Sequence, residues 1–455
     1  MNILFVSLGC DKNTVDSEVM LHHLGIQGHR FTDEEEQAEA VIVNTCCFID
    51  AAKEESIDEI LRFAERKKQG LIRALIVTGC LAQRYREEIL REIPEVDAVV
   101  GVTTFDRIQE VLDEVMKGKE APVCVGDADD ASPVSTKRMI TTGGHFEFLK
   151  IAEGCDKRCT YCIIPKIRGH YRSVPMEALL EEARSLAEAG VRELILVAQE
   201  CTRYGEDLTG RKQLPELLKE LCRIDGLHWI RVLYCYPEEI TDELIDVIAT
   251  EDKICKYLDL PIQSGSDGIL RRMGRRIDRD GIISLVGRIR SRIPDVCLRT
   301  TLISGFPGET AQDHRQTMEL VRELRFDHLG VFPYSQEEGT PAAAFPDQVS
   351  ERVKKTRQTK LMKLQQEISR ERNEELVGRI VEAVIEGRID GEDAPDEVVY
   401  LARTMRDAPE VDGYLFIEGV DPSRDLLTGT FVRVRITGAG DYDLTGEMYE
   451  DESAE

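Results

Sequence analysis

The sequence predicts an α/β protein with an N-terminal doubly wound parallel-sheet domain, a central partial β/α barrel and a small C-terminal antiparallel β-barrel. The chain has 455 residues, of which 42% are hydrophobic, so it is long enough for about three buried cores. Short apolar runs alternate with amphipathic ones up to about residue 345, which is typical of parallel sheets flanked by helices. After residue 378, short strand-like runs alternate with Gly-rich and Asp-rich turns, which indicates an all-β unit.

Residues 1–125 form the first predicted domain. Its apolar runs Ile3–Leu8, Ala40–Val43 and Ala74–Val77 are expected to be buried parallel strands, with a helix over Glu54–Arg66 between two of them. The following segment, residues 126–145, changes composition to DADDASPVSTKRMITTGG and has little periodicity, so it is predicted to be a linker.

Residues 146–375 form the second predicted domain, in which strands and helices again alternate. Six β-then-α units favour an open or closed β/α barrel, with chemistry at the carboxyl ends of its strands; a doubly wound sheet is the alternative. The predicted strands are Phe148–Ala152, Leu194–Ala198, Trp229–Leu233, Tyr257–Ile262, Val296–Ile303 and His328–Pro333, and helices are expected at Met176–Ala189, Ala311–Leu324 and 350–375.

The last predicted domain covers residues 376–449, and residues 450–455 are expected to be a disordered acidic tail. Its predicted strands are Ile380–Ile385, Val398–Leu401, Tyr414–Ile417 and Phe431–Ile436.

The charge balance narrows the possible partners. The chain has 59 Lys and Arg against 86 Asp and Glu, a net charge of -27, which disfavours a broad phosphate-binding surface and leaves direct nucleic-acid binding a minor role. The start MNILFVSLGC lacks the basic residues of an export signal, and no apolar run approaches the length of a membrane span. We therefore expect a cytoplasmic protein without membrane contact, whose odd count of 13 Cys points to thiols or metal ligands rather than disulfides.

Three cysteines carry the strongest chemical signal. Cys155, Cys159 and Cys162, in EGCDKRCTYC, follow the first strand of the central domain with the spacing C-x-x-x-C-x-x-C. Three thiolates at this spacing can bind three irons of a four-iron four-sulfur cluster and leave the fourth iron open for a substrate or cofactor. Structural zinc is the alternative, but it would need a fourth ligand that the adjacent sequence does not offer.

This motif, with Tyr161 between its last two cysteines, resembles the radical S-adenosylmethionine enzymes. The resemblance implies a partial β/α barrel whose open iron binds S-adenosylmethionine. One electron then cleaves that cofactor to methionine and a 5′-deoxyadenosyl radical, which removes a hydrogen atom from an unactivated carbon.

Three more cysteines are expected to meet at one edge of the first sheet. Cys10, Cys46 and Cys80 each follow a predicted parallel strand, and the carboxyl ends of such strands gather at one edge. They could hold a second cluster with an open iron, or be small buried residues. The remaining cysteines lie singly in apolar or helical contexts and are expected to be core residues: Cys47, Cys124, Cys201, Cys222, Cys235, Cys255 and Cys297.

The segments SLGCDKNTVDSE, NTC and TGC look like the three signatures of the methylthiotransferase family, and the order of domains matches that family over nearly the whole chain. The resemblance implies that Cys10, Cys46 and Cys80 hold an auxiliary cluster, that the C-terminal unit is a TRAM domain, and that the cofactors are two 4Fe-4S clusters and S-adenosyl-L-methionine. One S-adenosylmethionine methylates a sulfur, a second supplies the radical, and a methylthio group is joined to carbon.

Other residues of the central domain are candidates for cofactor contacts. Gln199 and Glu200 follow the second barrel strand and resemble the family's segment for binding S-adenosylmethionine. We also expect Tyr161, in the cysteine motif, to contact this cofactor. Arg168 and Arg172, in PKIRGHYRS, could pair with a carboxylate or be solvated. The Gly-containing loop TTLISGFPGET lacks the GxxxxGK[ST] pattern, so nucleotide hydrolysis is excluded.

Two branches of the family compete, one that modifies an adenosine of transfer RNA and one that modifies the β-carbon of an aspartate in small-subunit ribosomal protein twelve. Residues 376–455 hold 20 acidic residues, 7 Arg and no Lys, a net charge of -13 that would repel nucleic acid and attract a basic ribosomal protein, free or in the ribosome; acidity that merely aids solubility is the alternative.

The motifs SLGCDKN and FPYSQEEGTPAA, with Glu337 and Glu338, resemble the ribosomal-protein branch, whereas PIQSGSD is closer to the transfer-RNA branch. The chemistry implies an electron donor such as a flavodoxin or ferredoxin. A non-enzymatic iron-sulfur protein that binds ribosomes remains an alternative outside the enzymes.

Overall fold

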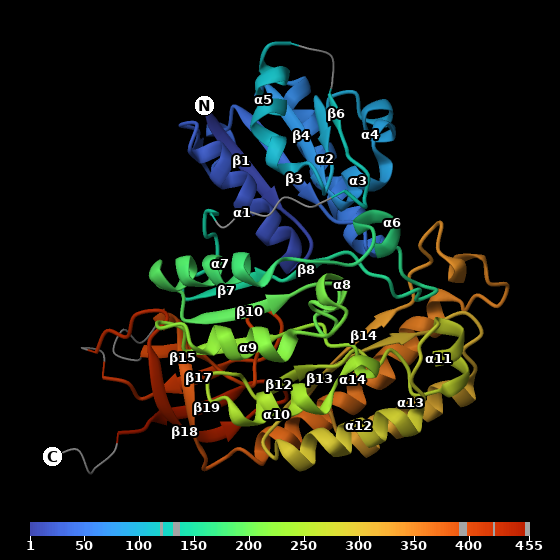
Figure 1. Cartoon of the computed structure of the whole chain (residues 1–455), viewed down its shortest axis with the longest axis vertical. Helices are drawn as coiled ribbons and strands as arrows, with labels where there is room; N and C mark the ends of the chain where they lie inside the picture. The colour runs from blue at the N-terminus through green and yellow to red at the C-terminus, as the bar shows by residue number, and fades with distance from the viewer. Residues whose placement is uncertain (119–121, 131–136, 391–397, 422–423, 451–455) are drawn as a thin grey trace.

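The structure is a computed structural model that describes residues 1–118, 122–130, 137–390, 398–421 and 424–450. In Figure 1 the N-terminal domain lies above the central domain. The C-terminal barrel packs against the left side of the same central domain. Part of the predicted linker, and all of the predicted tail except Glu450, lie outside the described residues.

The N-terminal domain is a six-stranded parallel sheet with the order β2-β1-β3-β4-β5-β6. Apolar cores cover both faces of the sheet, so the predicted doubly wound fold is confirmed. The strands are β1 (Asn2–Ser7), β2 (Arg30–Phe31), β3 (Ala40–Thr45), β4 (Ala74–Gly79), β5 (Ala98–Val100) and β6 (Val123–Cys124). The main helices are α1 (Asp11–Gly25), α2 (Asp50–Lys68), α3 (Cys80–Tyr85), α4 (Glu87–Glu92) and α5 (Ile108–Met116).

The strand order places the site-bearing loops. β3 and β4 are buried along their whole length, as their apolar runs Ala40–Val43 and Ala74–Val77 predict for central parallel strands. The chain crosses from β2 back over β1 to β3, so the order reverses between β1 and β3. Loops at such a reversal point diverge and leave a crevice at the carboxyl edge of the sheet.

The central domain is an open barrel of six parallel strands, as predicted. Two three-stranded sheets, β11-β10-β7 and β12-β13-β14, are joined by a bridge between Ile230 and Ile254. The strands are β7 (Phe146–Lys150), β10 (Glu193–Val197), β11 (Trp229–Val232), β12 (Tyr257–Asp259), β13 (Cys297–Ser304) and β14 (His328–Pro333), with a short hairpin of β8 (Ala152–Glu153) and β9 (Arg172–Ser173).

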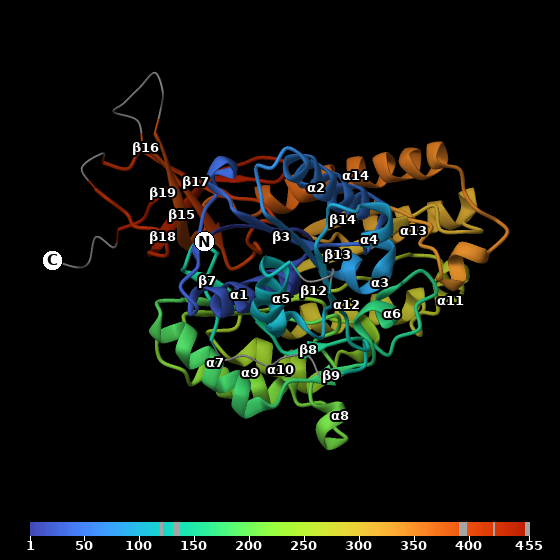
Figure 2. The ribbon, with the colours of Figure 1, turned by 90° about the horizontal axis from the view of Figure 1, so that it is seen from above.

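Helices pack against the outer side of these strands and enclose the largest apolar core. They are α6 (Ile164–Arg168), α7 (Met176–Glu188), α8 (Glu206–Thr209), α9 (Leu214–Cys222), α10 (Asp242–Thr250), α11 (Asp267–Met273), α12 (Arg279–Arg292), α13 (Ala311–Leu324) and α14 (Glu351–Glu374). Figure 2 shows α7, α9 and α10 along one side of the barrel and α14 along the opposite side.

The segment predicted as a linker includes a buried arginine that ties the first two domains together. The side chain of Arg138 is 1% exposed and pairs with Glu18 of α1 at 2.8 Å, Glu147 of β7 at 2.9 Å and Glu182 of α7 at 3.0 Å. A guanidinium shared by three buried carboxylates fixes the position of the N-terminal domain on the barrel.

The C-terminal unit is a closed five-stranded barrel, β15-β16-β17-β19-β18. The sequence prediction missed its last strand, and β17 pairs with that strand in parallel, so the barrel is not antiparallel throughout. The strands are β15 (Ile380–Asp390), β16 (Val398–Thr404), β17 (Leu415–Glu418), β18 (Phe431–Ala439) and β19 (Leu444–Met448).

This barrel covers the amino ends of the central strands. Arg403 of β16 pairs with the buried Glu193 at the start of β10 at 2.6 Å, and Phe431 packs edge to face on Trp229 at the start of β11. It therefore lies at the end of the central strands opposite to their carboxyl ends. Among the described residues, no helix is both long and apolar enough to cross a membrane.

Candidate active site

The carboxyl edge of the N-terminal sheet faces the carboxyl ends of the barrel strands. Asp11, at the start of α1, accepts a hydrogen bond at 3.0 Å from the hydroxyl of Tyr234, which follows β11. The backbone N–H of Asp50, at the start of α2, donates to the hydroxyl of Ser335, which follows β14, at 3.0 Å. The two edges where chemistry was expected therefore meet in one interface.

The structure brings Cys10, Cys46 and Cys80 together at this interface. Cys10 follows β1, Cys46 follows β3 and Cys80 begins α3 after β4. Gly9 has a φ of 108°, and a Cβ atom at this position would come within 3.0 Å of Cys46 Cβ, so glycine is needed for the close approach of the two loops. The prediction that these cysteines gather at one sheet edge is confirmed.

The thiols of Cys46 and Cys80 are buried, and that of Cys10 is partly exposed. Burial raises the pKa of Cys46 to about 12, and the neighbouring Cys80 and Cys10 thiols add to the rise. Burial also raises the pKa of Cys80, while the charge of Arg168 opposes the rise. Cys46 and Cys80 therefore favour the protonated form until a metal displaces their protons, as is usual for metal-binding cysteines.

The second cysteine triad lies on the loop that follows β8. Burial raises the pKa of Cys155 to about 12, and Cys159 adds to the rise. Burial also raises the pKa of Cys162, with contributions from Cys159 and Cys155. The backbone N–H of Cys162 donates to the carbonyl of Cys159 at 3.1 Å, which curls the loop so that its thiols share one region.

The donor chemistry fits the clusters that the sequence predicts. Within the described residues, no group of three or more His, Cys, Asp and Glu side chains is arranged to hold a single metal ion. Cluster ligands each bind a different iron, so they lie farther apart than ligands that share one ion. Two sets of three thiols match clusters with an open iron better than structural zinc, which takes four protein ligands. Cys47 also lies near the first set, where Cys80 adds to the rise in the pKa of Cys47 that burial causes.

Gln199 and Glu200, the predicted cofactor-binding residues, lie near the second triad. Gln199 Nε2 donates to Glu153 at 2.8 Å, while its Oε1 is buried and has no hydrogen-bond partner among the described residues. Glu200 is 1% exposed, and burial raises its pKa to about 7 despite Lys157 at 3.6 Å. Glu200 also acts electrostatically on Cys155, raising that thiol's pKa. Unpartnered buried oxygens of this kind suit a polar cofactor.

Tyr161 lies within this loop, and two residues that the motifs did not mark, Tyr236 and Arg275, lie near it. The ring of Tyr161 packs edge to face on Phe306. The hydroxyl of Tyr236 lies 2.8 Å from Cys159 Sγ, and the guanidinium of Arg275 covers the Tyr236 ring at 4.2 Å. Arg275 Nη1 is buried without a hydrogen-bond partner among the described residues. Only the fold could reveal Tyr236 and Arg275, because Tyr236 lies in the loop after β11, Arg275 lies just after α11, and no motif marks them.

Arg168 connects the two triads. Its Nη1 donates to Asp16 of α1 and to Glu153 of β8, both at 2.9 Å, and its Nη2 lies 3.4 Å from Cys80 Sγ. Since Glu153 also accepts from Gln199, a hydrogen-bonded path runs from Cys80 to Gln199 across the interface. Of the two readings for Arg168, pairing with carboxylates is confirmed. Arg172 lies at the edge of this network and donates to backbone carbonyls, at 2.7 Å to that of His170.

Glu337 and Glu338 also join the domains. Arg84 of α3 pairs with the buried Glu337 at 2.8 Å, and the hydroxyl of Tyr85 donates to Glu338 at 2.6 Å. The FPYSQEEGTPAA segment therefore holds the N-terminal domain against the barrel rim. Ser264, in the segment PIQSGSD, is buried and accepts from the backbone N–H of Ser266 at 3.2 Å.

Lys12 lies within the first cysteine motif and points its charge into the interface. It is 5% exposed, and its ammonium lies 3.4 Å from the ring centre of Tyr234. Burial by itself lowers the pKa of Lys12, but Cys10, Tyr234 and Asp11 outweigh burial and raise the pKa above its usual value, so the side chain is charged. Its charge also lowers the burial-raised pKa of Cys201, which follows β10.

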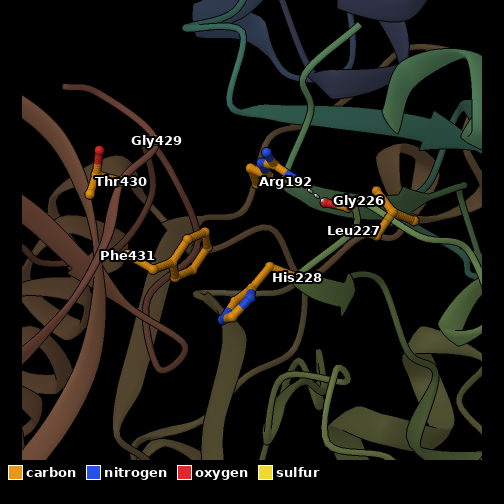
Figure 3. Close-up of a pocket in the computed structure, with 7 residues that line it drawn as sticks. All are labelled: Arg192, Gly226, Leu227, His228, Gly429, Thr430 and Phe431. Carbon is orange, nitrogen blue, oxygen red and sulfur yellow. Dashed lines mark hydrogen bonds between the residues drawn. The ribbon is translucent and has the colours of Figure 1, made fainter. Parts of the chain in front are cut away.

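A separate pocket of about 500 Å³ lies between the amino ends of the central strands and the C-terminal barrel. Figure 3 shows Phe431 and His228 facing each other across this junction, with Arg192 beside them. None of the residues predicted to carry chemistry lines this pocket.

The cysteines predicted to be core residues are buried, except Cys222, which is half-buried.

Comparison with known proteins identifies the family. Three segments match described families: residues 2–101 match "Uncharacterized protein family UPF0004", residues 149–321 the "Radical SAM superfamily" and residues 377–448 the "TRAM domain". The chain is 57% identical to a ribosomal protein uS12 methylthiotransferase RimO of Lachnoclostridium phytofermentans, covering 98% of this chain and 99% of that protein. The chain belongs to the RimO methylthiotransferase family.

A second RimO relative, from Geobacter sulfurreducens, is 50% identical and covers 98% of both chains. Among solved structures, the radical S-adenosylmethionine methyltransferase TsrM from Kitasatospora setae matches with a TM-score of 0.55 and 16% identity, covering 75% of this chain and 76% of that one. That likeness concerns the fold. Membership of the RimO family confirms the expected fold class and the expected class of enzyme, a radical S-adenosylmethionine methylthiotransferase.

Proposed function

We propose that this enzyme attaches a methylthio group to the β-carbon of an aspartate in ribosomal protein uS12. Its RimO relatives carry that substrate in their names. The structural observation that supports the proposal most is that two largely buried cysteine triads lie on the two sides of one interface. Arg168 contacts Cys80 of one triad and Glu153, two residues before the other triad, and Glu153 accepts from Gln199. A protein that only carries or senses iron would not need two open sites bridged in this way.

Each triad has a separate role in this proposal. Cys155, Cys159 and Cys162 hold the cluster that binds S-adenosylmethionine, and Cys10, Cys46 and Cys80 hold the auxiliary cluster. When bound, the two 4Fe-4S clusters and S-adenosylmethionine supply the electron, the hydrogen-abstracting radical and the methylthio group.

The chain's own residues bind and shield these groups. The unpartnered oxygens of Gln199 and Glu200 are available to bind polar groups of S-adenosylmethionine beside Cys155, and the ring of Tyr161 supplies apolar contact. Burial of the whole region excludes water, which protects a reactive carbon radical.

The C-terminal barrel supports a basic protein as substrate rather than transfer RNA. Its exposed acidic side chains Glu382, Glu410, Glu418 and Glu447 lie on several strands and loops. Such a surface attracts the basic uS12 and repels a phosphate backbone. Part of the acidity has a different use, because Asp407 and Asp412 turn inward, where they lie near His328 in the junction with the central barrel. An electron donor such as a flavodoxin or ferredoxin completes the proposal.

Mass spectrometry of uS12 and of transfer RNA from a strain without this gene tests the substrate. We expect uS12 to lose its methylthio group and transfer RNA to keep all of its own, with restoration by the wild-type gene but not by Cys46→Ala or Cys155→Ala. Loss of the methylthio group from transfer RNA instead would refute the proposal. Absence of 5′-deoxyadenosine formation under reducing conditions would favour a non-enzymatic protein.

A further inference from the structure

Lys12 is a buried cation that lacks the usual partner. Among the described residues it forms no ion pair with a carboxylate, and the face of the Tyr234 ring is its close contact, at 3.4 Å. Other buried cations near the interface are paired: Lys150 with Glu153 at 3.1 Å, and Arg168 with Asp16 at 2.9 Å. A buried ammonium without an anion costs folding free energy, so its presence calls for a ligand.

The position of Lys12 on its helix adds to that cost. It lies in the first turn of α1, where the helix dipole disfavours a positive charge. The N-cap residue Cys10 provides no side-chain hydrogen bond to this end, and its carbonyl accepts from the backbone N–H groups of Asn13 and Thr14. The N–H groups of Asp11 and Lys12 therefore have no backbone partner among the described residues. An anion bound here would satisfy both the ammonium and the helix end.

The surroundings of Lys12 place that anion between the two triads. Lys12 is two residues from Cys10, and its charge reaches Cys201, the neighbour in sequence of Glu200. The ring of Tyr234 lies against Lys12, and the backbone of Tyr234 has a φ of 56°. This left-handed conformation is strained for an aromatic residue. The N–H of Tyr234 donates to Asp259 and its hydroxyl to Asp11, both at 3.0 Å, and these bonds hold it in place.

We propose that Lys12 binds the side-chain carboxylate of the substrate aspartate, and so presents the adjacent β-carbon to the space between the two cysteine triads. This inference rests on the proposed function. The target carbon is bonded directly to the carboxyl carbon, so anchoring the carboxylate restricts where the hydrogen atom to be removed can lie. A buried ammonium also makes the site selective, because an amide in place of the carboxylate would leave the charge uncompensated.

The test is a double-mutant cycle between enzyme and substrate. The full-length enzyme with both clusters and S-adenosylhomocysteine, under anaerobic conditions, is titrated with unmodified uS12 and with uS12 in which the target aspartate is changed to Asn. Wild-type enzyme is expected to bind the Asp form at least about 10-fold more tightly, as is usual for a desolvated charge pair. Lys12→Met is expected to bind both forms equally and weakly, and Lys12→Arg to recover part of the preference.

A matched control removes a charge elsewhere. Lys68→Met changes the net charge by the same amount, but Lys68 lies exposed on α2 beside Glu95, so this variant is expected to keep the wild-type preference for Asp over Asn. Iron content and thermal unfolding are measured on every variant. Because Lys12 forms no ion pair with a carboxylate within the described part of the chain, Lys12→Met is expected to keep both clusters and to be about as stable as wild type.

Several results would overturn the inference. Equal binding of the Asp and Asn forms by the wild-type enzyme would do so while leaving the proposed function intact. If Lys12→Met weakened the binding of the Asp and Asn forms of uS12 by the same factor and also lowered the stability of the enzyme, Lys12 would have a structural role. Loss of iron in that variant would make Lys12 a counter-charge for the auxiliary cluster. Failure of the wild-type enzyme to bind uS12 at all would overturn the proposed function together with this inference.

Discussion

Arg168 Nη2, on the central barrel, lies 3.4 Å from Cys80 Sγ, on the N-terminal domain. The same guanidinium is buried and paired with Asp16 and Glu153. Although burial by itself raises the pKa of Glu153, Arg168 and Lys150 lower it to about 2, so the carboxylate stays charged. Arg168 therefore contacts Cys80, a proposed ligand of the auxiliary cluster. It also contacts Glu153, which lies two residues before Cys155, the first proposed ligand of the other cluster.

Replacing Arg168 should weaken the interface and change the auxiliary cluster. Arg168→Met leaves Asp16 and Glu153 with only Lys150 as a counter-charge, and we expect a loss of roughly 3 kcal/mol in the free energy of unfolding. The midpoint of anaerobic urea denaturation measures this loss. Arg62→Met, which removes an ion pair with a half-exposed arginine, should cost less than about 1 kcal/mol.

The same variant should lower the reduction potential of the auxiliary cluster, because a positive charge beside a cysteine ligand stabilises the reduced, more negative state. A redox titration followed by electron paramagnetic resonance measures the potential, and Arg168→Lys should restore part of it. An unchanged potential in Arg168→Met would show that the contact with Cys80 is only structural.

Removal of one cysteine from each triad should remove one cluster each. Anaerobic reconstitution of Cys46→Ala and of Cys155→Ala should each give half of the wild-type iron, with different absorption and resonance spectra for the cluster that remains. Cys47→Ala is a matched control, because Cys47 is buried next to Cys46 but is not a proposed ligand, and it should keep the full iron content. Full iron in Cys46→Ala would eliminate the proposed auxiliary site.

The pair of Arg84 and Glu337 should hold the N-terminal domain on the barrel rim. Glu337→Gln leaves the guanidinium of Arg84, 9% exposed, without its closest carboxylate, and we expect a cost of about 3 kcal/mol. Faster hydrogen exchange in α3 would be the specific sign. Glu338→Gln changes the next residue, which is 67% exposed, and should leave the exchange of α3 nearly unchanged.

His328 should make the junction with the C-terminal barrel sensitive to pH. Burial by itself lowers the pKa of His328, but Asp412, Cys297 and Asp407 outweigh it and raise the pKa well above its usual value. A raised folded-state value means that the stabilisation is complete below the unfolded pKa of about 6.5 and is lost as the pH rises through the folded value.

Denaturation of wild type and His328→Gln at several pH values checks this. The difference in stability between the two should be largest near pH 6 and should shrink as the pH rises above about 6.5 toward the folded-state pKa. A difference that stays constant over the alkaline range would contradict the charged state of His328.

Local sequence patterns were sufficient to predict most of the fold. The apolar runs after Ile3, Ala40 and Ala74 specify buried parallel strands, because such strands need apolar side chains on both faces. The helix over Ala311–Leu324 was predicted to the residue, and its capping box at Thr310 and Asp313 explains why it begins there. The last strand, Leu444–Met448, was missed because its polar and glycine content resembles a turn.

The sequence by itself determined the two sets of cysteines, since ligand spacing and the position of a residue after a strand are local properties. The tertiary structure decided how the sets face each other, that Arg168 lies between Cys80 and Glu153, and that Lys12 packs on Tyr234. It also placed Tyr236 and Arg275 beside Cys159. Arg168 reaches Cys80, and Lys12 reaches Tyr234, only when the edges of the two sheets pack together. Burial then makes an unpaired charge costly, and that cost exists only in the folded chain.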